Sequence, residues 1–388
     1  MTEQPVPLLA PSAWPELTSQ TAGVGGVWKQ SPEDFLVEEI PAYLPCGEGE
    51  HLFLWIEKRN LSSEMLVAQL SKQLAVPRSE IGMAGLKDRQ AITRQWVSVP
   101  TRAEKLVPAV ESDDLQVLEA RRHRNKLKTG HLKGNRFVAI LRGVEPDLSK
   151  IDAITRQLQA QGCPNYFGMQ RFGHQHSTWK LGWQLLLGQI SPQDIPAPRR
   201  KFLLRLALSA VQSGLFNEVL AQRLRDGLFS TVLCGDLMEI LPAGAKFLVT
   251  DAAADQPRFD SWEISTTGPI FGVRMRSPGG EVHARELAIL QKLVLTIEHF
   301  QKFSSLMEGT RRPFRFLPAG LTCELLPANS SDHETPRGDL RVSVELPAGA
   351  YLTVLLHEFQ KSPLEAAESP DSAGNSEDAD EIASQSAD

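Results

Sequence analysis

The chain has 388 residues, of which 41% are hydrophobic and 23% charged, the composition of an ordinary globular protein of about two domains. No apolar run is long enough to span a membrane, and the N-terminus has an early acidic residue, two prolines and no basic start, which argues against a secretory signal and for the cytoplasm. The four cysteines lie far apart without a CxxC pair, so we expect free thiols and no zinc site.

The net charge of −6 is unevenly distributed along the chain. Residues 362–388 hold eight acids and no Lys or Arg, so without them the net charge becomes +2. Because this segment is rich in Ser, Ala, Asp and Glu and lacks aromatic residues, we expect a disordered acidic tail over 361–388. Any function is therefore expected in the mildly basic body.

The first 160 residues alternate between strand and helix patterns. A helix is expected from Ser62, a suitable N-cap, with Leu66, Leu70 and Leu74 on its buried side, and a second helix over 147–160 ends near Gly162. Alternating hydrophobic residues predict strands over 34–40, 51–58, 92–99 and 136–142. One helix for each small group of strands indicates an α+β or mixed-sheet fold.

The middle of the chain, 162–317, is mostly helical in pattern, whereas strand patterns return after Pro318. Strand-rich ends around a helical middle predict one domain, formed by 1–160 and 319–360, that is interrupted by an inserted domain over 161–318. The clearest helix patterns are 200–225 and 284–300, and the strand patterns are 237–240, 246–249, 261–264, 321–326, 340–346 and 351–357.

The loop Met83–Gln95 contains a carboxylate, Asp88, between two cations, Lys87 and Arg89. Opposite charges on both sides stabilise an ionised carboxylate. Gly85 permits a sharp turn or a close approach to a ligand. Taken alone, the loop is either an ordinary solvated turn or the site of a reactive carboxylate.

A second polar segment, residues 121–136, carries seven Lys or Arg, two His and no acid. A run of charge is often only a solvated face, but this one could neutralise several phosphates of a nucleic acid. Asn135 either forms a turn after Gly134 or offers its amide to the edge of a base. The cations of this basic run are Arg121, Arg122, Arg124, Lys126, Lys128, Lys133 and Arg136.

Residues 165–173 (NYFGMQRFG) combine three aromatics with an arginine and two glycines. Such aromatics can stack on bases, although a packed domain junction is the more usual role for this kind of segment. Phe35 and Tyr351 pose the same choice between core residue and stacking platform. Three arginines, Arg311, Arg312 and Arg315, add cations where the insertion would rejoin the main domain.

Several chemistries have no motif in this chain. The sequence contains no GxxxxGK[ST] loop, no GxGxxG opening a helix, no HExxH, no paired-cysteine metal site and no GxSxG. We therefore expect neither a metal nor a small-molecule cofactor, so that any reaction depends on side chains alone.

Taken together, these segments resemble the TruD family of pseudouridine synthases, which isomerise uridine to pseudouridine in tRNA. The matches run in family order from about residue 29 to 355. The matching motifs are Lys29-x4-Asp34-Phe-x-Val-x-Glu39, Ala84-Gly-Leu-Lys-Asp-Arg-Gln-Ala-Ile-Thr-Arg-Gln95, His123-x-Asn-Lys-Leu-x2-Gly-x-Leu-x-Gly-Asn-Arg-Phe137, Asn165-Tyr-Phe-Gly-x-Gln-Arg-Phe-Gly173, Glu308-Gly-x-Arg-Arg312 and Leu346-Pro-Ala-Gly-x-Tyr-x-Thr353.

The resemblance implies a pseudouridine-synthase-like catalytic domain with a mixed, largely antiparallel sheet, interrupted by an inserted α/β (TRUD) domain. It implies that Asp88, in the GxKDRxA motif, is the catalytic aspartate, and that Phe35 and Asn135 line the uridine pocket. The third pocket position is usually Phe, but here it is Tyr351, whose hydroxyl needs a partner or solvent if buried. The isomerisation is redox-neutral, which agrees with the lack of cofactor motifs.

The leading hypothesis is a cytoplasmic, monomeric tRNA pseudouridine synthase that, by resemblance, modifies uridine-13 in the D-arm after flipping it out of its stack. The basic run would grip the tRNA backbone, while Lys87 and Arg89 would hold Asp88 ionised or contact phosphates. An alternative is a non-catalytic RNA-binding or RNA-remodelling protein that uses the same basic groove. A third interpretation is a metal-dependent nuclease with scattered carboxylates.

Overall fold

The structure, a computed structural model, describes residues 14–327 and 337–362. Most of the expected acidic tail lies outside them, although Lys361 is described and ends the last helix. The strands are β1 (Phe35–Pro41), β2 (His51–Arg59), β3 (Gly82–Met83), β4 (Ile92–Pro100), β5 (Leu115–His123), β6 (Leu132–Val144), β7 (Cys163–Pro164), β8 (Leu237–Ile240), β9 (Lys246–Leu248), β10 (Ile264–Ile270), β11 (Thr310–Pro313), β12 (Arg315–Phe316), β13 (Ala319–Pro327) and β14 (Gly338–Pro347).

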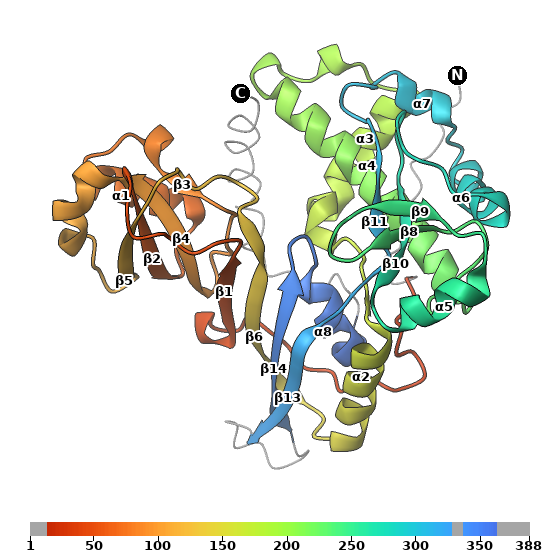
Figure 1. Cartoon of the computed structure of the whole chain (residues 1–388), viewed down its shortest axis with the longest axis horizontal. Coiled ribbons are helices and arrows are strands. Elements are labelled where there is room, and N and C mark those ends of the chain that lie inside the picture. The colour runs from red at the N-terminus through yellow and green to blue at the C-terminus, as the bar shows by residue number, and fades with distance from the viewer. Residues whose placement is uncertain (1–13, 328–336, 363–388) are drawn as a thin grey trace.

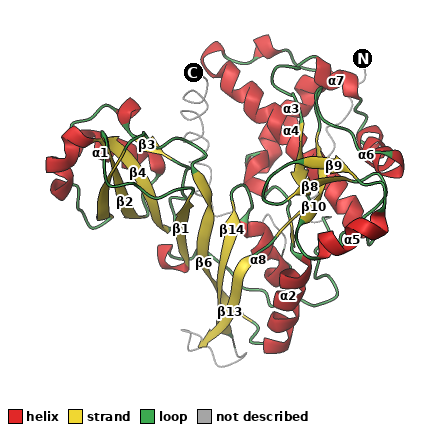
Figure 2. Cartoon of the chain, viewed as in Figure 1, coloured by secondary structure: helices red, strands yellow, loops and turns green. Residues whose placement is uncertain are grey.

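The helices gather mainly at one end of the molecule, on the right of Figure 2, while the long strands fill its left and middle. Within the described residues, no helix is both long and apolar enough to cross a membrane. The α-helices are α1 (Ser63–Gln73), α2 (Leu148–Gln161), α3 (Ser177–Leu187), α4 (Ala197–Arg225), α5 (Ala252–Asp260), α6 (Gly280–Lys292), α7 (Ile297–Gln301) and α8 (Leu352–Gln360).

Eight strands form one sheet in the order β13-β14-β6-β1-β4-β2-β5, with β3 beside β4. Among the described strand pairs, β1–β4 is parallel and the others are antiparallel. The expected mixed, largely antiparallel sheet is therefore confirmed. It unites strands from both ends of the chain, because β14 pairs with β6 over its whole length (Figure 1).

Two separate cores cover the same face of this sheet. On one side, α1 places Leu66 and Leu70 against Leu54 and Ile56 of β2. On the other, α2 and α8 share a larger core with β1, β6 and β14. Residues that lie directly opposite on neighbouring strands point to the same face. The register therefore shows that both cores lie on one face and that the boundary between them falls at the parallel pair β1–β4. The site described below lies at this boundary.

The chain between β7 and β12 forms a second body of helices around the four-stranded sheet β11-β10-β8-β9, which we call the inserted body. Its long helix α4 buries Phe216 and Leu220 in the same core as α8, so the two bodies share one hydrophobic interior. The predicted helix over 200–225 is confirmed and begins three residues earlier, with proline in its first turn.

Three predicted elements are wrong. Residues 351–357 form helix α8 and no strand, because Leu352, Leu355, Leu356 and Phe359 are buried at helical spacing, which a short apolar run cannot distinguish from a strand. The expected helix 284–300 is two helices, α6 and α7, since the backbone at Val294 is left-handed, with φ of 57°. The strand expected at 261–264 begins only at Ile264, because Ser261 ends α5 and Trp262 is also left-handed.

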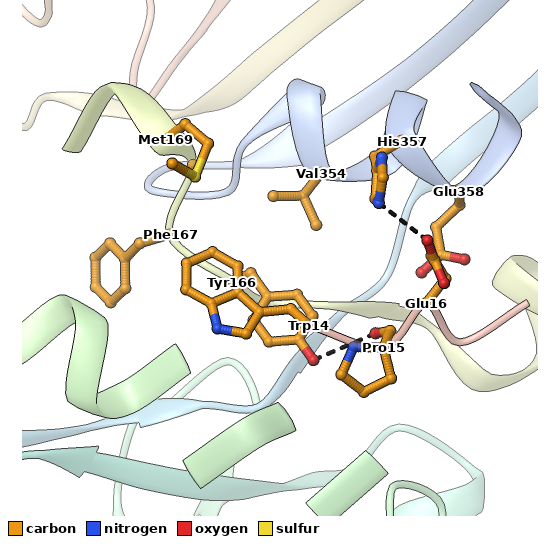
Figure 3. A pocket seen from close by; sticks show the side chains of 10 residues that line it. Trp14, Pro15, Glu16, Tyr166, Phe167, Met169, Val354, His357 and Glu358 are labelled. Atoms are coloured by element: carbon orange, nitrogen blue, oxygen red, sulfur yellow. Dashed lines mark hydrogen bonds and ion pairs between the residues drawn. The ribbon is translucent and has the colours of Figure 1, made fainter. Parts of the chain in front are cut away.

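The segment 165–173 lies largely at a packed junction, the more usual of its two expected roles. The rings of Trp14 and Tyr166 stack 5.5 Å apart, and Tyr166 donates a hydrogen bond to the carbonyl of Pro15 (Figure 3). On the other side, Glu358 of α8 accepts hydrogen bonds from the backbone amides of Leu17 and Thr18. The N-terminal segment thereby ties α8 to the inserted body.

Candidate active site

Polar side chains lie on the sheet at the boundary between its two hydrophobic cores. Glu39 of β1 lies opposite Asn135 of β6, and Thr93 of β4 lies opposite Lys58 of β2. All four are on the face that carries the cores, yet they interrupt its apolar surface. Buried polar groups cost free energy unless they are paired. Such a row of polar residues therefore indicates a functional site, because packing alone would not require it.

Asp88 stands at this place, in the loop between β3 and β4. Its side chain is 44% exposed, and its carboxylate forms an ion pair of 3.2 Å with the ammonium group of Lys29. The loop is anchored beneath the carboxylate, because Lys58 donates a hydrogen bond of 3.0 Å to the carbonyl of Asp88. A fixed backbone with an accessible carboxylate suits a group that reacts with a ligand.

Lys29 connects Asp88 to the aromatic residue of the first motif. Its ammonium lies 4.5 Å from the ring centre of Phe35 and 4.6 Å from that of Trp28, within cation–π range. Phe35 is only 2% exposed and stacks on Phe137 at 6.0 Å. The structure thus brings Asp88, Lys29 and Phe35 together by direct contacts.

Lys87 faces away from Asp88. Its ammonium pairs at 2.9 Å with Glu39, and the two side chains are 3% and 1% exposed. Ser63, at the start of α1, also accepts a hydrogen bond from the backbone amide of Lys87. The cation that contacts Asp88 is therefore Lys29, whereas Lys87 fastens the loop to β1 and α1. Arg89 is exposed beside Asp88.

Asn135 shares the sheet face of Phe35 and Phe137. It lies two residues before Phe137 on β6, and its side-chain oxygen is buried without a hydrogen-bond partner among the described residues. An unpaired buried acceptor costs about 1–3 kcal/mol, which a ligand with a hydrogen-bond donor would recover. This oxygen is thus able to accept a hydrogen bond from a ligand.

Tyr351 approaches the site from the other end of the chain. It precedes α8, in the turn after β14, where Leu346 lies opposite Asn135. Its ring is 6.0 Å from that of Phe167, and a side chain on Gly168 would collide with it. Tyr351 therefore lies where the eight-stranded sheet meets the inserted body.

The basic run forms the end of β5, a loop and the start of β6. The loop is joined to the Asp88 loop, because the backbone amide of Gly130 donates a hydrogen bond of 2.8 Å to the carbonyl of Ala84. Arg121, Arg122, Arg124 and Arg136 each pair with a glutamate, and Lys126 donates to the carbonyl of Ser79. Within the described residues, Lys128 and Lys133 are exposed and have no ion-pair partner.

Sequence reasoning missed two residues of the site, Lys29 and Glu39. Both belong to the first motif, Lys29-x4-Asp34-Phe-x-Val-x-Glu39, but a motif does not reveal which partners its ends contact. The strand register supplies the answer, since it aligns Glu39 with Asn135 and leaves Lys29 before β1, above Phe35.

Known proteins share the sequence of this chain over nearly its whole length. The family described as tRNA pseudouridine synthase D (TruD) matches residues 15–192 and 199–359. The chain is 42% identical over 357 residues to tRNA pseudouridine synthase D of Anaeromyxobacter dehalogenans, an alignment that covers 92% of this chain and 99% of the relative. It is 38% identical to the protein of the same name from Thermus thermophilus, over 94% and 98% of the two chains.

A solved structure shows the same fold. The crystal structure from Methanosarcina mazei that is named for tRNA pseudouridine synthase D (TruD) superposes with a TM-score of 0.75 at 24% identity, covering 93% of this chain and all of that one. The family match spans nearly the whole described chain, and the relatives align over almost their full length. The chain belongs to the tRNA pseudouridine synthase D (TruD) family.

Proposed function

We propose that this protein isomerises uridine to pseudouridine in tRNA, at uridine-13 of the D-arm, with Asp88 as the catalytic residue. The observation that supports this most is the accessible carboxylate of Asp88, held by Lys29 beside Phe35. Phe35 shares its sheet face with Asn135, whose side-chain oxygen has no partner among the described residues. The activity follows the family, and the position in tRNA follows the resemblance of the motifs.

The reaction requires few groups. The N1–C1′ bond breaks, the base turns, and C5 bonds to C1′ with loss of the C5 proton, so no atoms are added overall. One carboxylate can serve first as nucleophile and later as base. The ion pair with Lys29 fixes where the Asp88 oxygens lie before the substrate arrives.

The target uridine has to leave its stack to reach this carboxylate. In the proposal, Asn135 offers its free oxygen to the imide N–H of the base, and Phe35 and Tyr351 border the base from opposite ends of the chain. Lys29 now lies over the ring of Phe35, so binding of the base is coupled to movement of that ammonium. Arg89, Lys128 and Lys133 are exposed cations that have no ion-pair partner among the described residues, and they would first meet the RNA backbone.

The test is to map pseudouridine in unmodified tRNA after incubation with purified protein. We expect the wild type to form it and Asp88→Asn to bind the tRNA with similar affinity but to form at least about 10³-fold less product, since a carboxylate essential to the chemistry is replaced by an isosteric amide. Asp113→Asn, a change at an exposed aspartate in the turn before β5, serves as the matched control and should keep full activity.

Three results would contradict different parts of the proposal. Asp88→Asn activity near that of the wild type would remove Asp88 from catalysis. Restoration of pseudouridine by Asp88→Ala in cells that lack the gene would instead favour a non-catalytic RNA-binding role. Product formed at another uridine, with Asp88 still required, would overturn only the position.

A further inference from the structure

The inserted body contains an open cavity of about 400 Å³ that the proposed catalytic site does not include. It lies between α4, strands β10 and β11, and the segment 167–171. Its lining includes an aromatic ring, three arginines, one glutamate and three hydroxyl groups, from Phe167, Arg171, Arg311, Arg312, Glu239, Ser209, Ser213 and Thr310. Arg171 and Arg312 come from two of the motifs named above, residues 165–173 and 308–312.

Two guanidinium groups reach this cavity without a carboxylate partner among the described residues. Arg171 donates to the hydroxyls of Ser209 and Ser213, at 3.0 and 3.4 Å. Arg312 donates to the carbonyls of Asn165 and Gly349, at 3.3 and 2.7 Å. The acids nearby are already paired, because Glu286 binds Arg311 and Glu239 binds Lys246.

The positive charge is therefore concentrated and partly desolvated. Burial lowers the pKa of Arg312 to about 10, and the like charge of Arg171 acts in the same direction, which shows that the two cations are close. Arg312 therefore stays charged at neutral pH. The ring of Phe167, 4.2 Å from the guanidinium carbon of Arg312, offsets only part of this cost, so an anion in the cavity would be strongly favoured.

We propose that this cavity binds a phosphodiester group of the substrate RNA. Its guanidinium groups are hydrogen-bond donors, and arginine pairs with phosphate in a bidentate geometry. The cavity also adjoins the turn that carries Tyr351: Arg312 holds the carbonyl of Gly349, and Phe167 contacts Tyr351. A phosphate here would fix the RNA beside the target uridine. This inference rests on tRNA being the substrate, as proposed above.

The test uses a tRNA that the wild-type protein modifies, and compares Arg171→Gln with Arg171→Lys. Arg171 is chosen because it contacts only side-chain hydroxyls, whereas Arg312 also supports the backbone. We expect Arg171→Gln to weaken tRNA binding about tenfold and to lower the slope of log K against log salt by about 0.7–0.9, the value for one phosphate contact. Arg171→Lys should keep the slope. Arg156→Gln, which removes an exposed cation of α2, is the matched control and should keep both affinity and slope.

A second measurement locates the partner. In a set of tRNAs with single methylphosphonate linkages, one linkage should weaken binding to the wild type and have no further effect on Arg171→Gln. Unchanged affinity and slope for Arg171→Gln, or the absence of such a linkage, would overturn the inference. Because binding is measured without turnover, this failure differs from failure of the proposed function, in which the wild type would form no pseudouridine.

Discussion

Lys29 is the residue whose importance is clearest in the structure and least visible in the sequence. It has a left-handed backbone, with φ of 60°, and its ammonium joins Asp88 to Phe35. A residue other than glycine in this conformation is strained, and strain of this kind persists where the surroundings require one side-chain position. We therefore infer that Lys29 positions the carboxylate of Asp88.

Substitutions of Lys29 can distinguish the effect of its ammonium group on activity from the effect of its backbone conformation on stability. Removing the ammonium should lower kcat by about 10- to 100-fold, the equivalent of one charge-assisted hydrogen bond, in both Lys29→Ala and Lys29→Gly. Lys29→Gly should nevertheless be more stable than Lys29→Ala by about 1 kcal/mol, because glycine adopts the left-handed conformation without strain.

Single-turnover rates and urea unfolding of the two variants check both expectations. Lys29→Arg, which keeps the charge, should retain more activity than either. Equal activity of Lys29→Ala and the wild type would show that Asp88 needs no cation beside it.

At the scale of elements, strand β1 holds two adjacent glutamates with opposite surroundings. On the outer face, Glu38 belongs to a row of alternating charges across five strands, which is formed by Glu57, Arg94, Glu38, Arg136 and Glu345. On the inner face, Glu39 is buried against Lys87. The alternation of a strand thus separates a partly exposed ladder from a buried pair.

This difference predicts unequal effects of the same substitution. Glu39→Gln should destabilise the fold by about 3–5 kcal/mol, because it leaves the ammonium of Lys87 buried without a counter-charge. Glu38→Gln should cost less than about 1 kcal/mol, since its partners are exposed and each has another glutamate. Urea unfolding of both variants measures the contrast.

The double variant Glu39→Leu with Lys87→Met tests the same pair from the other side. Apolar side chains of similar size often replace a buried ion pair without loss, so its stability should return to near that of the wild type. A double variant as unstable as Glu39→Gln would mean that Lys87 and Glu39 do not act through their mutual charge.

At the scale of the whole molecule, the sequence predicts local elements well and contacts between them poorly. Capping and hydrophobic period locate α1, since Ser62 caps it and Leu66 and Leu70 are buried, because these signals lie within a few residues. The prediction of a strand at 351–357 is wrong because the conformation of this segment depends on the packing of α8 against the inserted body.

The same distinction applies to the site. The motifs propose Asp88 and Asn135 as site residues, but they do not predict the ion-pair partner of Asp88, because Lys29 lies 59 residues away in sequence. Likewise, the basic run has no acid of its own, yet other parts of the chain bring it Glu48, Glu104 and Glu345. Charge along the chain therefore overstates the charge available to RNA.

One prediction concerns the junction that joins both ends of the chain to the inserted body. His357 of α8 lies there, 3.2 Å from Glu16 (Figure 3). Burial lowers the pKa of His357, and the neighbouring Glu16 only partly opposes this effect. The folded protein therefore binds a proton at this site less readily than the unfolded chain, whose histidine has a pKa of about 6.5.

The sign of the pH dependence follows from this difference. Above about pH 6.5 the histidine is neutral in both states and has no effect on stability. As the pH falls below 6.5, the unfolded chain takes up the proton first, so stability decreases until the lower folded pKa is passed.

The melting temperature, measured from pH 7.5 to 5, should fall less steeply in His357→Gln than in the wild type. His174→Gln, a change at an exposed histidine, should keep the wild-type slope. If the slopes of His357→Gln and the wild type coincide, the junction does not respond to protons through His357, and other groups cause its acid sensitivity.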